Sequence, residues 1–256
     1  GCQGASNFAA FGSKVTMLEI GPRILGLEDR AVSAEVRRGF QARGIEVLTG
    51  IEGVTRIEKT GHQVTLNYRF GGEEISITAE AVLLAVGWVG NVDDLKLAVA
   101  GVQVERGYVP VNEHLQTSAA HIFAAGDITG RMMLVQSAGY EARIAAENAV
   151  LGPGLRIEHR IVPHGGFTDP EYASVGLTEQ AARESGQPHL YATVPYADLD
   201  RAVIDGRPEG LFKLIVSEET HRILGAHAVG EQALEIVQLV ATGMAADMWV
   251  EQLAEV

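Results

Sequence analysis

One segment of the chain limits the possible folds more than any other: an apolar run that ends in a glycine and a single acidic residue. Residues 122–125 are all apolar, and Gly126 and Asp127 follow them directly. This pattern predicts a buried strand that delivers one carboxylate to its carboxyl end, where α/β sheets bind cofactors. Gly126 would let a ligand approach the backbone, and Asp127 would accept hydrogen bonds from ligand hydroxyls. An ordinary turn or N-cap at Asp127 is the alternative.

The residues that follow favour a ligand site. A helix is predicted over residues 134–150, and its small residues recur at helical spacing. They form a narrow stripe made of Ala138, Ala142, Ala145 and Ala149. Such a face suits close packing on a sheet or on a cofactor.

Together, residues 122–130 and this helix resemble the flavin-contacting motif of the class I pyridine nucleotide-disulfide oxidoreductases. That family includes dihydrolipoamide dehydrogenase, mercuric reductase and glutathione reductase. The resemblance implies that Asp127, preceded by Gly126, holds the ribityl chain of FAD. It also implies that the start of the helix passes beneath the flavin ring. The candidate flavin contacts there are Met133, Leu134, Val135 and Ala138.

The first 48 residues alternate between helix and strand patterns. A helix is predicted over residues 3–11, with Ala5, Phe8, Ala9 and Phe11 facing inward. A strand over 13–19, a helix over 30–43 and a short strand over 45–48 follow. Alternation of this kind predicts parallel strands and a doubly wound α/β sheet, the Rossmann-like architecture.

Two residues of this segment match a dinucleotide site. In a Rossmann unit a glycine-rich turn precedes the first helix, and an acidic residue follows about twenty positions later. By resemblance Gly1 is the last glycine of that turn, so a pyrophosphate would lie on the helix N-terminus. Glu19 would bind ribose hydroxyls and repel a 2′-phosphate, which favours NADH over NADPH, although the nearby Arg23 weakens that preference. A solvated strand end is the alternative for Glu19.

The next segments resemble the rest of the nucleotide-binding domain. Alternating apolar residues over 64–78 predict a β-hairpin, which matches the β-meander that the family inserts into this domain. Residues 81–88 read as a buried strand that opens onto a glycine. By resemblance, Val86 and Gly87 would pass close to the nicotinamide dinucleotide.

The last hundred residues resemble the interface domain of the same family. Residues 152–154 predict a domain boundary, and residues 167–179 match the opening of that domain closely. Strands are predicted over 211–217 and 222–229, and an apolar helix over 233–244. In the family this domain builds a twofold dimer, so we expect a homodimer. An ordinary monomeric core is the alternative.

These patterns together predict three domains. A NAD(P)-binding domain would span residues 1–111, the last segment of an FAD-binding domain residues 112–152, and a dimerisation domain residues 153–256. His227 lies in one of the apolar strands, and we expect it to be structural.

Composition narrows the functional classes. The formal net charge of −13 argues against nucleic acid, which needs a basic face. No stretch of eighteen apolar residues predicts a membrane span, and no Cys and His spacing predicts a zinc site. Cys2 is the only cysteine, so no internal disulfide can form, and a cytoplasmic location fits.

The resemblance implies an enzyme that passes hydride from NAD(P)H to FAD and then electrons to a disulfide or a metal ion such as mercuric ion. Such enzymes use a pair of thiols and a His-Pro segment, which this chain does not match, so no catalytic residue can be assigned. We therefore expect a fragment that reduces no disulfide by itself and retains FAD weakly. A non-catalytic nucleotide-binding or dimerisation module and a diaphorase-type flavoprotein are the alternatives.

Overall fold

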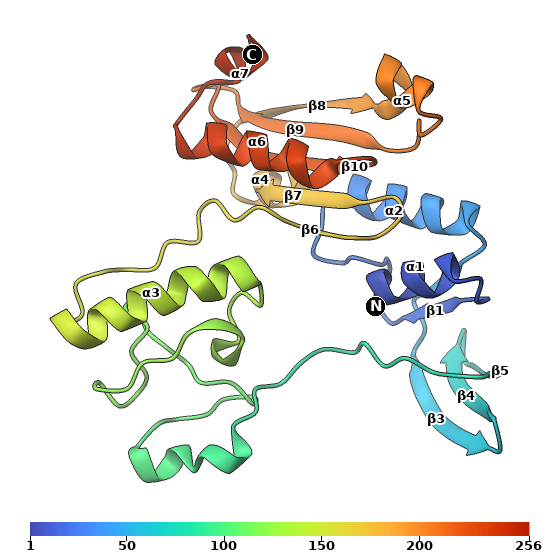
Figure 1. Cartoon of the computed structure of the whole chain (residues 1–256), viewed down its shortest axis with the longest axis horizontal. Helices are drawn as coiled ribbons and strands as arrows, with labels where there is room; N and C mark the ends of the chain where they lie inside the picture. Colours follow the sequence, from blue (N-terminus) through green and yellow to red (C-terminus); the bar gives the residue numbers. More distant parts are fainter. Residues whose placement is uncertain (256) are drawn as a thin grey trace. The chain divides into compact units, whose positions relative to one another are not determined.

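The structure is a computed structural model, and it describes residues 1–255. The chain divides into two compact units. The larger unit consists of Gly1–Ala85 and Pro163–Val256, and the smaller unit is Val86–Val162. Figure 1 shows the elements of both units coloured along the chain. Within the described part of the chain, none of the helices has both the length and the apolar character needed to cross a membrane. The division into three domains stays a prediction.

The larger unit begins with the predicted alternation of helices and strands. Its elements are α1 (Cys2–Ala10), β1 (Thr16–Glu19), α2 (Arg30–Ala42) and β2 (Glu46–Thr49). Strands β1 and β2 pair in parallel, as expected for a Rossmann-like layer. Their core is apolar and includes Ala5, Ile24, Val32, Val36, Phe40, Ile45 and Val47.

Two expectations for the first ninety residues are wrong. Phe8 and Phe11 are exposed, because only the face of α1 that carries Ala5 packs on the core. The strand expected over residues 81–88 does not form, and its residues are irregular and mostly exposed. A strand needs a hydrogen-bonding neighbour, and within residues 1–255 the parallel sheet consists of β1 and β2 alone.

A three-stranded antiparallel sheet follows, with the order β3-β4-β5. Its strands are β3 (Gly53–Thr60), β4 (Gln63–Phe70) and β5 (Glu73–Ala79). The predicted hairpin is confirmed as β4 and β5, joined at Gly71 and Gly72, which have φ values of 62° and 81°. Positive φ at both positions is the requirement of a tight two-residue hairpin turn. Strand β3 was not predicted, because its residues are largely exposed and give little apolar alternation.

The rest of the larger unit is a five-stranded antiparallel sheet with the order β6-β7-β10-β9-β8. Its strands are β6 (His164–Gly166), β7 (Tyr172–Gly176), β8 (His189–Pro195), β9 (Leu211–Ser217) and β10 (Ile223–Val229). Helix α6 (Ala233–Ala245) packs against β7 and β10, and α2 also contacts β10 (Figure 1). The predicted strands and helix of this region are confirmed. The short helices of the region are α4 (Glu179–Glu184), η4 (Tyr196–Asp198), α5 (Asp200–Ile204) and α7 (Val250–Ala254).

The smaller unit is built around α3 (Val135–Leu151), which confirms the predicted helix. Its other elements are the short helices η1 (Asp93–Leu95), η2 (Leu97–Ala100) and η3 (Gly126–Thr129). The buried strand expected over residues 122–125 is wrong. Those residues are half-buried, and their one ladder contact is the bridge between Phe123 and Gln116.

The face that α3 buries is also different from the expected alanine stripe. Ala142 and Ala149 are exposed. The buried residues are Ser137, Glu141, Ile144, Ala145 and Asn148. A helix face that includes an acid and an amide has to satisfy their hydrogen bonds inside the protein, and these bonds organise the site described next.

Candidate functional site

Gly126 lies in a closely packed turn of the smaller unit. It opens η3, is buried, and has a φ of 78°, a left-handed conformation that disfavours any side chain. A Cβ atom at this position would lie 3.1 Å from the Cβ atom of Ala138. The structure therefore brings two predicted site residues together, with Ala138 directly behind the glycine turn.

Asp127, the next residue, presents its carboxylate to solvent. The side chain is exposed, and it accepts no hydrogen bond from any group within residues 1–255. The backbone carbonyl oxygen of Asp127 accepts from the Gly130 amide at 3.0 Å, which closes the turn. The carboxylate is held on an ordered turn and is available to a ligand.

The other predicted flavin contacts lie at the start of α3. Leu134 is the residue before the helix, has an extended conformation, and provides no side-chain cap. Val135 opens the helix with 90 % of its side chain exposed, and Met133 is also exposed. Amides in a first helical turn have no acceptor within the helix. The site thus combines the turn at Gly126, the exposed carboxylate of Asp127 and the uncapped start of α3. This combination fits a ligand with hydroxyl groups and a planar ring, as FAD has.

On the nucleotide side, Gly1 is the N-cap residue of α1 and is exposed. The helix has no side-chain cap and no acidic residue in its first turn, so its amides are open to an anion. Cys2 follows, and burial raises the pKa of its thiol. A thiol of this kind is a poor nucleophile at neutral pH.

Glu19 lies at the end of β1, where the sequence placed it. Its Oε1 atom accepts a hydrogen bond of 2.6 Å from the Gly21 amide. A Cβ atom on Gly21 would lie 3.1 Å from the same oxygen, so the small residue permits the contact. The carboxylate is thereby fixed, and Oε2 receives no hydrogen bond from any side chain or amide of residues 1–255.

Arg23 is committed to its own loop. Its guanidinium donates to the carbonyl oxygens of Leu25, Gly26 and Glu28 at 3.1, 2.7 and 2.9 Å. Three carbonyl partners use both terminal nitrogens, so the cation closes the loop after β1.

Val86 and Gly87 belong to the smaller unit and lie outside any strand, with the chain bending at Val86. Val86 is 91 % exposed, and Gly87 has a φ of 121°. The burial that the sequence suggested for them is wrong. Their proposed role near a nicotinamide stays a prediction.

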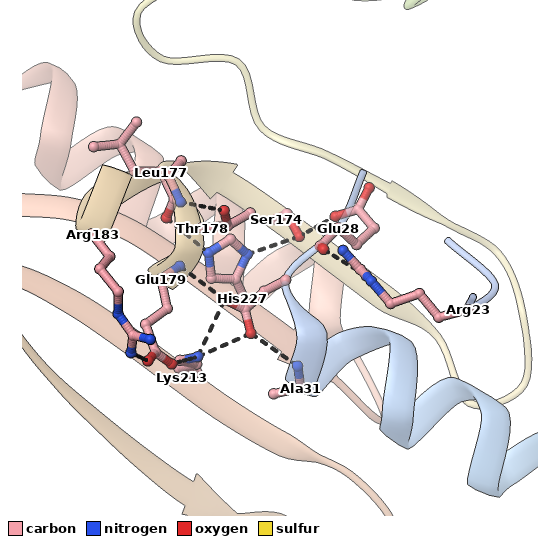
Figure 2. Close-up of polar contacts among 12 residues, drawn as sticks. Arg23, Glu28, Ala31, Ser174, Leu177, Thr178, Glu179, Arg183, Lys213 and His227 are labelled. Carbon is pink, nitrogen blue, oxygen red and sulfur yellow. Dashed lines mark hydrogen bonds and ion pairs between the residues drawn. The ribbon is translucent and has the colours of Figure 1, made fainter. Parts of the chain in front are cut away.

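A buried polar network anchors the loop after β1 to the five-stranded sheet (Figure 2). Asp29 caps α2 by accepting from the Ala31 amide, and it also accepts from the Glu179 amide at 2.9 Å. Lys213 Nζ lies 3.0 Å from Asp29 and 2.6 Å from Glu179. Asp29 and Lys213 are 2 % and 4 % exposed, so the ion pair is almost fully desolvated.

A second branch of the network runs through Ser174. The Ser174 hydroxyl donates to Glu28 at 2.5 Å and lies 3.0 Å from Nδ1 of His227. His227 Nε2 donates to the Leu177 carbonyl oxygen at 3.0 Å (Figure 2). His164 Nε2 contacts the other oxygen of Glu28 at 3.1 Å. His227 is fully buried in β10, in line with the structural role expected for it.

The network shifts the pKa values of its members. Burial by itself would raise the pKa of Asp29, but hydrogen bonds from Glu179, Ala31 and Lys213 outweigh it and lower that pKa. The pKa of Glu28 is lowered in the same way, with His164 opposing the effect of burial. For Lys213 the two carboxylates outweigh burial and raise the pKa. Burial lowers the pKa of His227.

Sequence reasoning missed this network, although one signal was present. Strand β9 alternates buried and half-buried positions, and Lys213 occupies a buried one between Leu211 and Ile215. A lysine on the apolar face of an alternating strand requires a buried acidic partner, but the sequence does not show which one. Within the described part of the chain, no three His, Cys, Asp or Glu side chains gather to form a metal site.

Comparison with known proteins gives consistent matches over most of the chain. A family model described as pyridine nucleotide-disulphide oxidoreductase matches residues 1–142. The model for the dimerisation domain of the same family matches residues 162–256.

Individual relatives are similarly consistent. The chain is 32 % identical over 249 residues to a mercuric reductase of Staphylococcus aureus. This alignment covers 97 % of the chain and 45 % of the relative. The chain is 36 % identical over 249 residues to a dihydrolipoyl dehydrogenase of Staphylococcus aureus, and the alignment covers 96 % of the chain and 53 % of that relative. The chain thus spans about half the length of the curated relatives it matches.

Solved structures share the fold. The HOCl-induced flavoprotein disulfide reductase RclA from Escherichia coli superposes with a TM-score of 0.86 at 30 % identity, over 97 % of this chain and 57 % of that one. LpdA from Mycobacterium tuberculosis superposes with a TM-score of 0.89 at 25 % identity, over 100 % and 55 %.

Proposed function

Because the chain belongs to the pyridine nucleotide-disulphide oxidoreductase family, we propose that it is part of an FAD-dependent enzyme that passes hydride from NAD(P)H to flavin and then electrons to a disulfide or metal-ion acceptor. When bound, FAD would supply the two-electron acceptance that the protein's own side chains lack. The observation that carries the proposal is the turn at Gly126 and Asp127. The glycine is buried, and the carboxylate of the aspartate that follows it is exposed to solvent.

On the flavin side, Asp127 would bind the hydroxyl groups of the ribityl chain. Gly126 allows the ligand to approach the backbone, and Ala138 supports the turn from behind. Met133, Leu134 and Val135 would contact the ring from the exposed start of α3.

On the nucleotide side, the start of α1 at Gly1 would bind the pyrophosphate, and Glu19 would accept hydrogen bonds from the adenosine ribose. NADH is the favoured coenzyme for two reasons. Glu19 is fixed by Gly21 and would repel a 2′-phosphate, and Arg23 is occupied by three carbonyl oxygens of its own loop. Val86 and Gly87 would lie near the nicotinamide.

The remaining assignments are proposed on the family match. Residues 1–111 would bind the nicotinamide dinucleotide, residues 112–152 would contribute to FAD binding, and residues 153–256 would form a twofold homodimer. The relatives include a mercuric reductase and a dihydrolipoyl dehydrogenase, so the acceptor is proposed to be a metal ion or a small disulfide substrate.

Two single variants, one in each proposed site, test the cofactor sites. Each protein is titrated with FAD, NADH and NADPH, and dissociation constants are measured by calorimetry. Asp127→Asn should weaken FAD about tenfold, the loss of one charge-assisted hydrogen bond, and leave NADH binding unchanged. Glu19→Ala should weaken NADH binding, leave FAD binding unchanged and reduce the preference for NADH over NADPH. Wild-type protein that binds neither FAD nor NADH would refute the proposal and favour a non-catalytic dimerisation module.

A further inference from the structure

The buried face of α3 contains an acid that the family motif does not explain. Glu141 is 0 % exposed, and it lies one helical turn after Ala138 and two turns before Asn148. A carboxylate removed from water in this way must be compensated by hydrogen bonds or by a cation.

Glu141 finds its first partner in the glycine turn. Its Oε2 atom accepts the backbone amide of Gly126 at 2.7 Å. The carbonyl oxygen of Gly126 accepts from the Thr129 hydroxyl at 2.9 Å. Both polar groups of this residue's backbone are therefore held by side chains, as expected for a residue outside regular secondary structure.

The second partner of Glu141 is His159. Nε2 of the imidazole ring donates to Oε1 of Glu141 at 2.9 Å. The edge of the ring meets Tyr140, with 5.9 Å between ring centroids and an interplanar angle of 78°. Nδ1 of His159 is buried and has no hydrogen-bonding partner within residues 1–255, so the contact with Glu141 is the one polar contact that orients the ring.

Asn148, farther along the helix, also forms buried hydrogen bonds to backbone groups, but those groups belong to other segments. Its amide nitrogen donates to the carbonyl oxygens of His114 and Leu155. Its carbonyl oxygen accepts from the amides of Gly154 and Leu155. Asn148 has no contact with the glycine turn, which makes it a matched comparison for Glu141.

We propose that Glu141 is a positioning residue for the flavin site. Through the Gly126 amide it fixes the orientation of the turn, and the turn determines where the carboxylate of Asp127 points. His159 holds Glu141 in the required rotamer. The functional part of this inference rests on the proposed flavin function, whereas the conformational part concerns the chain alone.

The test compares two conservative variants of Glu141 in the full chain. Glu141→Gln keeps the length and an acceptor oxygen, and Glu141→Asp keeps the charge but shortens the side chain by one methylene. The first measurement is hydrogen exchange of the Gly126 amide by NMR without FAD, and the second is the FAD dissociation constant. Asn148→Leu is the control, because it removes a buried polar group from the same helix.

We expect Glu141→Gln to retain Gly126 protection and FAD affinity, because the amide oxygen can accept from Gly126 while its NH2 group donates to Nε2 of the other neutral tautomer of His159. Glu141→Asp should lose both by about tenfold, because the shorter side chain cannot reach the amide. Asn148→Leu should lower the melting temperature without changing either readout. Normal Gly126 protection in Glu141→Asp, or an equal loss in Asn148→Leu, would overturn the proposal.

The two readouts separate this inference from the flavin function. If the wild type binds no FAD, but Gly126 exchange responds to the variants as expected, the flavin function fails and the conformational role of Glu141 stands. If Glu141→Asp loses Gly126 protection but binds FAD normally, the positioning role is refuted.

Discussion

Lys213 Nζ lies 3.0 Å from Asp29 Oδ1, so the centre of β9 is joined to the residue that caps α2. The two residues are 184 positions apart in the sequence. Their contact fastens the loop that follows Glu19 to the five-stranded sheet (Figure 2). The loop that contains Arg23 and follows Glu19 is therefore attached to a sheet that the family match assigns to dimerisation.

Replacing Lys213 with methionine should destabilise the larger unit. The variant leaves the Asp29 carboxylate buried with only amide donors, and a broken buried ion pair costs about 3 kcal/mol. Urea denaturation followed by circular dichroism measures the change. Lys59→Met, at an exposed position of β3, is the control and should alter the free energy of unfolding by less than about 0.5 kcal/mol. Equal stability of the two variants would mean that the pair contributes nothing.

Acid should destabilise the protein in two ranges of pH. The pKa of His227 is lowered from 6.5, so its contribution is present above that pH and declines as the pH falls below it. The pKa values of Glu28 and Asp29 are lowered from 4.5 and 3.8, so their contribution is lost only in stronger acid, as the pH falls through the lowered values. Denaturation curves at about pH 7, 5 and 2.5 separate the ranges. His227→Gln should remove the decline in the higher range and keep the lower one.

Substituting alanine for either of two glycines near the start of α3 should change stability in opposite directions. Gly126→Ala places a side chain at a φ of 78° and 3.1 Å from Ala138, which should cost about 1–3 kcal/mol. Gly139→Ala adds a methyl group to an exposed helical position with open space around it, and should stabilise by about 0.5–1 kcal/mol. Thermal unfolding of both variants measures the two effects. A neutral Gly126→Ala would show that the turn can relax.

Arg23→Ala should loosen the loop after β1 without a selective loss of NADPH binding. The guanidinium supports three carbonyl oxygens, so its removal should weaken NADH and NADPH by similar factors. Dissociation constants for both coenzymes, measured beside those of Glu19→Ala, test this. If NADPH alone weakens by about tenfold or more, Arg23 reads the 2′-phosphate and the preference for NADH is wrong.

Local patterns in the sequence were enough to predict α1, α2, α3, β4, β5, β9 and β10. In each case the apolar periodicity and the residues that begin and end the element lie within one short segment of the sequence. The strands expected over 81–88 and 122–125 failed for a physical reason, since a strand forms only beside a partner and an apolar run contains no information about its neighbours. The inward orientation of Phe8 failed for the same reason, because burial depends on what the helix packs against.

The sequence by itself determined the family, the four long helices α1, α2, α3 and α6, and the positions of Gly126, Asp127 and Glu19. It could do so because a glycine before an acid at the end of an apolar run has its meaning within a few residues. Only the tertiary structure decided what holds these residues. The partner of Glu141 is the Gly126 amide, the partner of Lys213 is Asp29, and Arg23 is used by its own loop. Such pairings arise when distant segments meet and buried polar groups have to be satisfied, so they cannot be read from the sequence around either residue.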